Sequence, residues 1–234
     1  MAPQDDVVKT GLKAALELAA DTPWEDLRQS DIAAHAGLPL DAFHGTSGKA
    51  ALAEAVEGLF DPAMSAEGVD PEDTARERLF DVIMLRFEAM EPYRAGLVSL
   101  MAWRRRAPLA LARLARARQR TAEWALVSAG LDGERDAPLP VKAAALALVL
   151  DRTERAWRQE TDTGLARTMA ALDEGLRTSE KRLERLRRLR GRRQADRDAD
   201  ATSASGAPEP GPAAAATPEA ADGHEAPPKA TPQA

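Results

Sequence analysis

Apolar residues recur every three or four positions over most of residues 8–189, and this spacing predicts a chain built from helices. The first run spans residues 8–19 and ends at the turn-forming sequence Asp21-Thr22-Pro23. Later runs begin at capping residues or prolines, namely Asp70, Pro92, Pro108 and Pro140.

Residues 30–60 contain two short helical segments separated by a tight turn, followed by a third helix. Ser30 is suited to cap the first segment, Gly37 supplies the turn, and Pro39 fits the first turn of the second segment. Helix, turn and helix in this order are typical of a helix-turn-helix motif.

This stretch resembles the N-terminal domain of the tetracycline-repressor (TetR) family of regulators. The residues that carry the resemblance are Asp31-Ile32-Ala33, Ala36-Gly37-Leu38 and Lys49-Ala50-Ala51-Leu52. The family pattern has a basic residue where this chain has Leu40, and a longer aromatic run where this chain has only Phe43-His44-Gly45-Thr46. The resemblance implies DNA contact through Leu40, His44 and Thr46 on the second short helix, with Lys49 on a phosphate.

Charge is distributed unevenly along the chain. Residues 1–75 hold four lysines or arginines against fifteen acidic residues, whereas residues 76–193 hold 26 against 16. Phosphate neutralisation supplies much of the affinity of proteins for DNA, so an acidic module must gather its few cations at the contact face. The cations of this module are Lys9, Lys13, Arg28 and Lys49.

Residues 148–176 resemble the C-terminal region of TetR-type proteins and share a faint pattern with the ubiquinone-biosynthesis accessory protein that has a TetR-like fold. The shared residues are Arg152-Thr153, Trp157, Leu165-Ala166-Arg167-Thr168 and Ala171-Leu172-Asp173. The two resemblances imply an all-α, TetR-like fold. Its N-terminal three-helix helix-turn-helix domain would span residues 1–61, and its larger helical bundle for ligand binding and dimerisation would span residues 70–193.

Six large apolar side chains of the second domain are candidates to line a pocket for a small apolar ligand. Ordinary core packing is the alternative role for each of them. They are Met84, Phe87, Trp103, Trp124, Leu148 and Trp157.

The C-terminal part of the chain changes character twice. Residues 177–193 predict a basic amphipathic helix, whose cations Lys181, Arg182, Arg185 and Arg188 could remain in water, contact an anionic membrane or contact a nucleic acid. Residues 194–234 are rich in alanine, proline and acidic residues, and they predict a disordered tail because they cannot bury enough apolar surface to offset the ordering entropy.

Catalytic chemistry finds little support in the sequence. The three histidines, His35, His44 and His224, are far apart, and no glycine-rich phosphate loop or nucleophile elbow is present. Without cysteine there is no thiolate metal site, and no apolar run is long enough to cross a membrane. We therefore expect a cytoplasmic protein that is not an enzyme and that needs no metal or cofactor.

Two functional hypotheses remain open at this point. In the first, the protein is a homodimeric TetR-type transcriptional regulator, in which a small apolar ligand changes the spacing of two DNA-binding domains. In the second, the TetR-like fold has lost DNA binding and acts as a lipid-binding accessory protein at a membrane surface. The acidic N-terminal domain, the shortened second helix and the basic terminal helix favour the second hypothesis. The family resemblance favours the first, and on that ground we expect a TetR-type regulator, with the accessory protein as the alternative.

Overall fold

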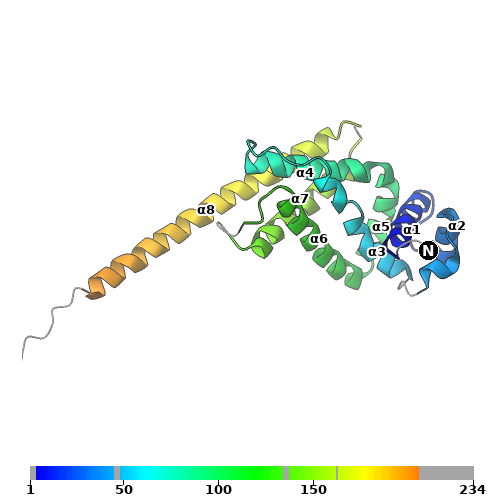
Figure 1. Cartoon of the computed structure of the whole chain (residues 1–234), viewed down its shortest axis with the longest axis horizontal. Coiled ribbons are helices and arrows are strands. Elements are labelled where there is room, and N and C mark those ends of the chain that lie inside the picture. The colour runs from blue at the N-terminus through cyan, green and yellow to red at the C-terminus, as the bar shows by residue number, and fades with distance from the viewer. Residues whose placement is uncertain (1–3, 45–47, 134–136, 162, 206–234) are drawn as a thin grey trace, which may run out of the picture. The chain divides into compact units, whose positions relative to one another are not determined.

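The computed structural model describes residues 4–44, 48–133, 137–161 and 163–205, and all regular structure in these ranges is helical, which confirms the predicted all-α architecture (Figure 1). The α-helices are α1 (Gln4–Leu18), α2 (Gln29–His35), α3 (Gly48–Leu59), α4 (Ala75–Met90), α5 (Arg94–Arg105), α6 (Pro108–Ser128), α7 (Leu139–Trp157) and α8 (Ala166–Ser205). Short 3-10 helices join some of them: η1 (Leu40–Phe43), η2 (Asp61–Ser65) and η3 (Glu91–Tyr93). Residues up to Leu189 form one compact unit, and a second unit begins at Arg190 within α8.

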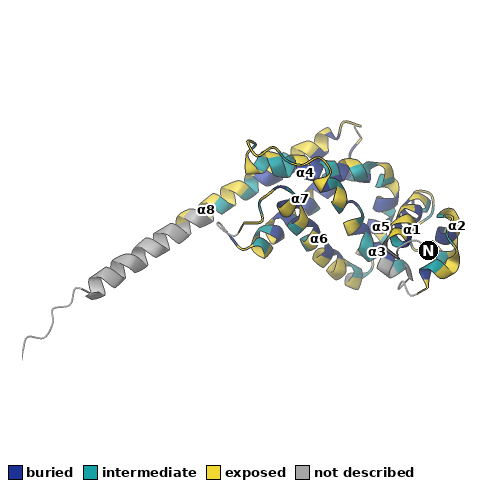
Figure 2. Ribbon diagram, in the orientation of Figure 1, coloured by how far each residue is buried: buried dark blue, intermediate teal, exposed yellow. Residues whose placement is uncertain are grey.

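The N-terminal helices share a small core in which α1 contacts α2, η1 and α3 (Figure 2). The buried side chains of this part include Leu12, Trp24, Ile32, Phe43, Leu52 and Val56. A side chain at Gly11 would begin only 2.6 Å from the Phe43 ring, so this glycine allows η1 to lie close against α1.

The helix-turn-helix segment departs from the prediction on both sides of its turn. The turn itself is confirmed, because Gly37 has a φ of +64°, a conformation that favours glycine. Ser30 does not cap α2, which begins one residue earlier, and its hydroxyl instead lies 3.3 Å from the Asp31 carboxylate. The expected second helix is a single 3-10 turn, because Pro39 keeps the backbone extended up to Leu40 and the next helix already begins at Gly48.

A capping box starts the long helix α4. The Thr74 hydroxyl accepts a hydrogen bond from the Glu77 backbone N–H, and the Glu77 carboxylate accepts one from the Thr74 backbone N–H. The expected start at Asp70 is therefore four residues too early. Asp70 instead accepts a hydrogen bond from the Glu72 backbone N–H, which forms a turn before the helix.

Trp157 at the end of α7 anchors the core of the larger part. Its ring lies 6.1 Å from the Phe87 ring of α4, and the Arg94 guanidinium lies 5.4 Å from its centroid. Its indole N–H donates to the Glu91 carboxylate at 2.8 Å. One buried tryptophan thus joins α4, η3, α5 and α7.

The N-terminal helices pack directly on α5. An added Cβ at Gly96 would lie 1.9 Å from the carbonyl oxygen of Leu16, so the backbones of α1 and α5 touch at this point. Nearby, the Trp24 backbone N–H donates to the Ser99 hydroxyl, and the Trp24 ring lies 6.5 Å from the Trp103 ring. These contacts make the N-terminal helices part of the same compact unit as α5.

Helix α8 continues past the boundary expected from the sequence. The tail was predicted to begin at residue 194, but the helix runs to Ser205. The lack of large apolar groups therefore does not end the helix at residue 194. Alanines recur through residues 195–204, and alanine is the strongest helix former. The rest of the predicted tail, residues 206–234, lies outside the described residues.

Candidate nucleic-acid interface and apolar groove

The η1 turn is the element that would face DNA in a helix-turn-helix protein. Leu40 at its start is 57% exposed, and His44 just after its end is also exposed. Between them, Phe43 turns inward and is buried. Thr46 lies outside the described residues. The structure therefore leaves Leu40 and His44 as the outward-facing members of the predicted contact set.

Lys49, the predicted phosphate contact, is turned toward the protein itself. Its ammonium group donates to the backbone carbonyl oxygens of Trp24 at 3.2 Å and of Glu25 at 2.6 Å. These two hydrogen bonds join the first turn of α3 to the segment that precedes α2. Binding a DNA phosphate would compete with them.

Acidic side chains lie on the elements that would approach the duplex. Asp31 is exposed in the first turn of α2, and Asp41 is exposed in η1. His35 at the other end of α2 is paired with Glu17 at 2.8 Å. Carboxylates at these positions repel phosphates and offset the exposed Lys13 and Arg28.

A buried ionic cluster joins α3 to α4, α5 and α6. Glu57 of α3 stands between three arginines: the Arg104 guanidinium lies 2.9 Å from its carboxylate, that of Arg86 3.5 Å and that of Arg118 3.7 Å. Arg118 also pairs with Glu154 of α7. All five side chains are nearly inaccessible to water.

Burial and the neighbouring arginines shift the pKa values of the carboxyl groups at this cluster in opposite directions. Burial alone would raise the pKa of the Glu57 carboxyl, but Arg118, Arg104 and Arg86 outweigh it and lower the pKa to about 2. At neighbouring Asp61, burial raises the pKa and is only partly offset by Arg86. Glu57 is therefore a fixed anion at neutral pH that holds three cations inside the protein.

An open groove of about 290 Å³ lies between α4, α6, α7 and α8. Its apolar lining includes Leu79, Leu126, Leu131, Leu146, Leu176 and Leu183. Lys142 and Arg76 lie at its edge, where they already donate to the Leu131 carbonyl and to the Asp173 carboxylate. The groove therefore offers apolar contact inside and polar groups outside, an arrangement found in small-molecule sites.

The six predicted pocket residues are spread over several places. Phe87 and Trp157 pack on each other in the core, and buried Met84 lies beside a separate acidic depression that includes Asp81. The other three are nearer the surface. Trp103 lines a small cavity next to α3, whereas Trp124 and Leu148 are 41% and 70% exposed.

The groove leucines are not among the large side chains that mark a candidate pocket in the sequence. Leucines recur on most of the described helices, and only the packing of the four helices decides which of them line the groove. Across the described ranges, no group of three or more His, Asp or Glu side chains could hold a metal ion. No helix in these ranges is long and apolar enough to cross a membrane.

Comparison with solved structures identifies the fold. A TetR transcriptional regulator from Nitrosomonas europaea ATCC 19718 is 22% identical over 76% of this chain and 99% of its own, with a TM-score of 0.60. A TetR transcriptional regulator from Rhodococcus sp. RHA1 is 16% identical over 76% of this chain and 97% of its own, with a TM-score of 0.53. A putative TetR-family transcriptional regulator from Rhodococcus sp. is 22% identical over 73% and 99%, with a TM-score of 0.50.

No protein-family model and no curated protein matches the chain. The structural matches nevertheless cover almost the whole length of each regulator. They confirm that the chain has the all-α fold of TetR transcriptional regulators. At these identities the likeness concerns the fold, and function has to be argued from the sites.

Proposed function

We propose that the protein binds a small apolar or lipid-like ligand in the groove between α4, α6, α7 and α8, and that its helix-turn-helix segment does not read DNA. The observation that carries this proposal is the orientation of Lys49. Its ammonium group donates to two backbone carbonyl oxygens of the protein, whereas the sequence predicts a phosphate contact at this position. The four-residue turn η1 exposes Leu40 and Asp41, one apolar and one acidic side chain, and neither can bind the phosphates of a DNA backbone.

The groove supports the ligand part of the proposal. Leucines from all four helices supply apolar surface, and burying an apolar ligand against them is favourable. The edge cations Arg76 and Lys142 already have protein partners, so they do not demand a charged ligand. A ligand with an apolar body and a small polar end in water fits this arrangement.

Dye binding to the full-length protein tests the groove. The probe is N-phenyl-1-naphthylamine, an uncharged dye whose fluorescence rises in apolar surroundings. Ala145→Trp fills the groove, whereas Ala144→Trp places the same side chain on the exposed side of α7 outside the lining. We expect the first variant to weaken dye binding roughly tenfold or more and the second to leave it unchanged. Equal effects would contradict a ligand site in the groove.

A DNA-binding regulator is the second candidate function, and the three solved structures with this fold favour it, because each is described as a TetR regulator. Its test is binding to DNA from the neighbourhood of the protein's own gene at two salt concentrations, beside a Leu40→Ala, His44→Ala variant. Both side chains are exposed, so the variant should fold normally. Tight, sequence-dependent binding that the variant loses would establish the regulator, whereas no binding at low salt would support the proposal above.

We also propose two further partners, a second copy of the chain and an anionic membrane. A homodimer is supported by the exposed apolar residues of α7, Val141 and Leu148. Contact with an anionic membrane is supported by the exposed Lys181, Arg182 and Arg185 of α8, together with Arg188, which also pairs with Glu184. A cytoplasmic location and the lack of a catalytic role are consistent with these binding roles.

A further inference from the structure

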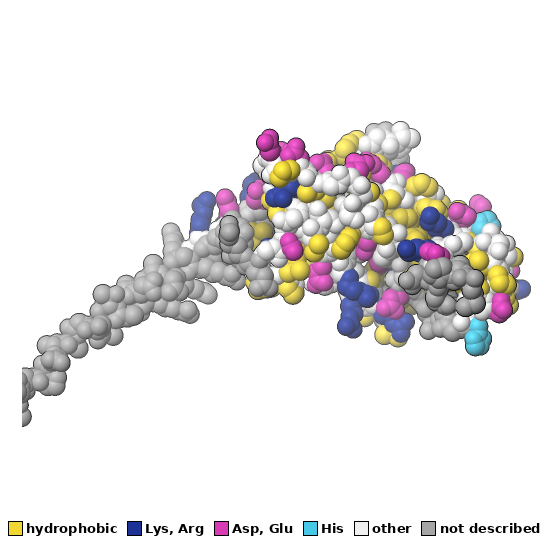
Figure 3. Space-filling view, in the orientation of Figure 1, with side chains coloured by type: hydrophobic (Ala, Val, Ile, Leu, Met, Phe, Trp, Pro, Cys, Tyr) yellow, Lys and Arg dark blue, Asp and Glu magenta, His cyan; other side chains and the backbone are white. Residues whose placement is uncertain are grey.

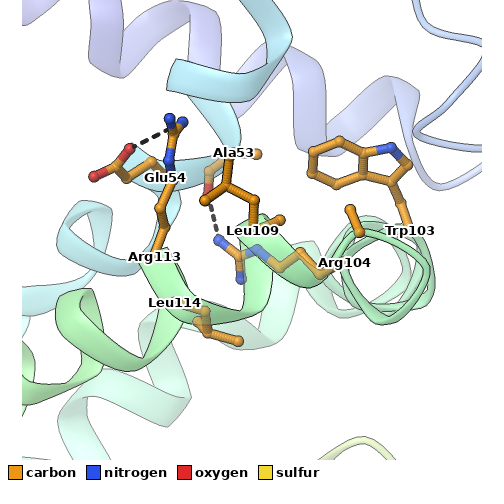
Figure 4. A pocket seen from close by; sticks show the side chains of 9 residues that line it. Ala53, Glu54, Trp103, Arg104, Leu109, Arg113 and Leu114 are labelled. Carbon is orange, nitrogen blue, oxygen red and sulfur yellow. Dashed lines mark hydrogen bonds and ion pairs between the residues drawn. The ribbon is translucent and has the colours of Figure 1, made fainter.

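A recess of about 200 Å³ opens between α3, α5 and α6 (Figure 4). Three alanines border it, Ala53, Ala107 and Ala110, and their small side chains leave space that larger residues would fill. Leu109 and Leu114 of α6 add apolar surface. The recess shares no lining residue with the groove between α4, α6, α7 and α8, so it is a separate candidate site.

Trp103 of α5 gives the recess an aromatic wall. Its ring lies 6.5 Å from the ring of buried Trp24, and the residue is still partly exposed. Leu109 is 68% exposed although it borders this apolar space. A molecule in the recess would cover part of both side chains, and removing apolar surface from water is favourable. An apolar occupant is therefore favoured, and an aromatic one gains further from contact with the Trp103 ring.

The charged groups that line the recess already have partners of opposite charge. The Arg104 guanidinium lies 2.9 Å from the Glu57 carboxylate. Arg113 pairs with Glu54 at a nitrogen–oxygen distance of 3.7 Å, and both side chains are exposed to water. Figure 3 shows basic and acidic side chains next to each other at the end of α6 that lies near α3. A charged occupant would lose water contacts and find no unpaired charge among these lining residues, so an uncharged one is favoured.

The volume of the recess limits the size of its occupant. An apolar cavity of about 150 Å³ in another protein takes up benzene. The recess, at about 200 Å³, can therefore hold one aromatic ring or two fused rings. It is too small for the acyl chain of a lipid.

We propose that the recess binds an uncharged aromatic molecule of one or two fused rings, in contact with the Trp103 ring. Ala53 and Glu54 belong to α3, so the bound molecule would connect α3 to α5 and α6. This occupant differs in chemistry from the lipid-like ligand proposed for the groove. The inference does not depend on whether the groove binds a ligand.

Fluorine NMR of the full-length protein tests this site. The probe is indole, an uncharged molecule of two fused rings. The chain contains four tryptophans, so labelling with 5-fluorotryptophan gives four resonances, which single Trp→Phe variants assign. Indole should shift the Trp103 resonance in a saturable way. The resonances of Trp124 and Trp157 should stay unchanged, because neither residue lines the recess.

Two pairs of variants on α6 locate the contact. Ala110→Phe fills the recess, whereas Ala112→Phe places the same side chain at an exposed position that does not line it. We expect the first to weaken indole binding roughly tenfold or more and the second to change it less than about twofold. Leu109→Ser should weaken it roughly threefold, and Leu111→Ser, also exposed but outside the lining, should not change it. Because Leu109 is strongly exposed, its variant should fold even if Ala110→Phe does not.

Matched small molecules test the chemistry of the occupant. Phenol and cyclohexanol share ring size and hydroxyl group, and phenol should bind roughly two- to tenfold more tightly, because only its ring makes aromatic contacts with Trp103. Indole-3-acetate adds a carboxylate to the rings of indole and should bind more weakly. Equal binding of phenol and cyclohexanol would argue against an aromatic site. Tighter binding of indole-3-acetate than of indole would argue against an uncharged occupant.

Two further results would overturn the proposal. The first is the absence of a saturable shift of the Trp103 resonance with indole. The second is indole binding that survives Ala110→Phe and is lost in Ala145→Trp, which would place the site in the groove. Indole binding that survives Ala145→Trp supports the recess whether or not the uncharged dye binds in the groove, so the two proposals fail separately.

Discussion

The Lys49 ammonium group lies 2.6 Å from the backbone carbonyl oxygen of Glu25, and through this hydrogen bond the first turn of α3 holds the segment between α1 and α2. A second hydrogen bond, to the Trp24 carbonyl, fixes the same ammonium group. The position that the sequence marks for a phosphate contact therefore has a structural role.

Replacement of Lys49 should consequently lower stability. Lys49→Ala removes two charge-assisted hydrogen bonds from a partly buried site, and we expect the free energy of unfolding to fall by about 1 to 2 kcal/mol. Lys13→Ala, an exposed lysine on α1, is the control and should change stability by less than about 0.5 kcal/mol. Urea denaturation followed by circular dichroism measures both. Equal stability of the two variants would show that the hydrogen bonds of Lys49 do not stabilise the fold, and it would favour a phosphate contact for this side chain instead.

Replacing Glu57 should lower the free energy of unfolding more than replacing most other polar residues of the chain. Glu57→Gln leaves Arg86, Arg104 and Arg118 buried without their shared anion, and breaking a buried ion pair in this way costs about 3 to 5 kcal/mol. Asp61→Asn should cost much less, because burial disfavours the charged form of Asp61. The measurement is the urea concentration at the midpoint of unfolding for each variant, together with the slope of the unfolding free energy against urea concentration. A larger loss for Asp61→Asn than for Glu57→Gln would contradict this ranking.

The same carboxylate predicts how stability depends on pH. Its pKa is about 2 in the folded protein, below the ordinary glutamate value of 4.5. The charged form therefore stabilises the fold fully above about pH 4.5, and this contribution is lost as the pH falls toward 2. The difference in unfolding free energy between the wild type and Glu57→Gln should shrink by roughly 3 kcal/mol across this window. A difference that stays constant from pH 5 to the lowest pH at which the protein folds would contradict it.

Local signals account for the parts of the fold that could be predicted from sequence. Pro108 and Gly130 bound α6 as expected, because a proline is preset for a first helical turn and a glycine with φ of +66° ends the helix. The extent of η1 could not be predicted in this way. It depends on where α3 begins, which is Gly48. The sequence on either side of residues 45–47 is also compatible with a longer second helix.

The candidate sites depended even more on tertiary packing. Lys49 lies more than twenty residues after the carbonyls that it binds, so no spacing rule connects them. The groove leucines come from four helices, and the large aromatics that sequence analysis preferred, such as Phe87 and Trp157, were taken up by the core instead. Size predicts burial well and predicts the lining of a cavity poorly.

Two glycines should respond in opposite ways to alanine. At Gly96 an added Cβ would meet the Leu16 carbonyl oxygen at 1.9 Å, and backbone atoms cannot move aside cheaply, so Gly96→Ala should cost about 2 kcal/mol or more. At Gly58 in α3 nothing lies within 4 Å, and Gly58→Ala should raise stability by about 0.5 to 1 kcal/mol through helix propensity. Thermal unfolding of both variants measures the contrast. Similar shifts in Tm would contradict the close contact between α1 and α5.

The exposed face of α7 makes the proposed homodimer testable. Leu148 is 70% exposed and Val141, one heptad before it, is 54% exposed, so both lie on the same side of the helix. In a two-fold symmetric dimer each substitution enters the interface twice, and Leu148→Asp would bury two opposed carboxylates. We expect light scattering to give about twice the 25.1 kDa chain mass for the wild type and the single-chain mass for Leu148→Asp. Leu40→Asp, at a position on η1 that is 57% exposed, should leave the dimer intact, and a monomeric wild type would refute the dimer.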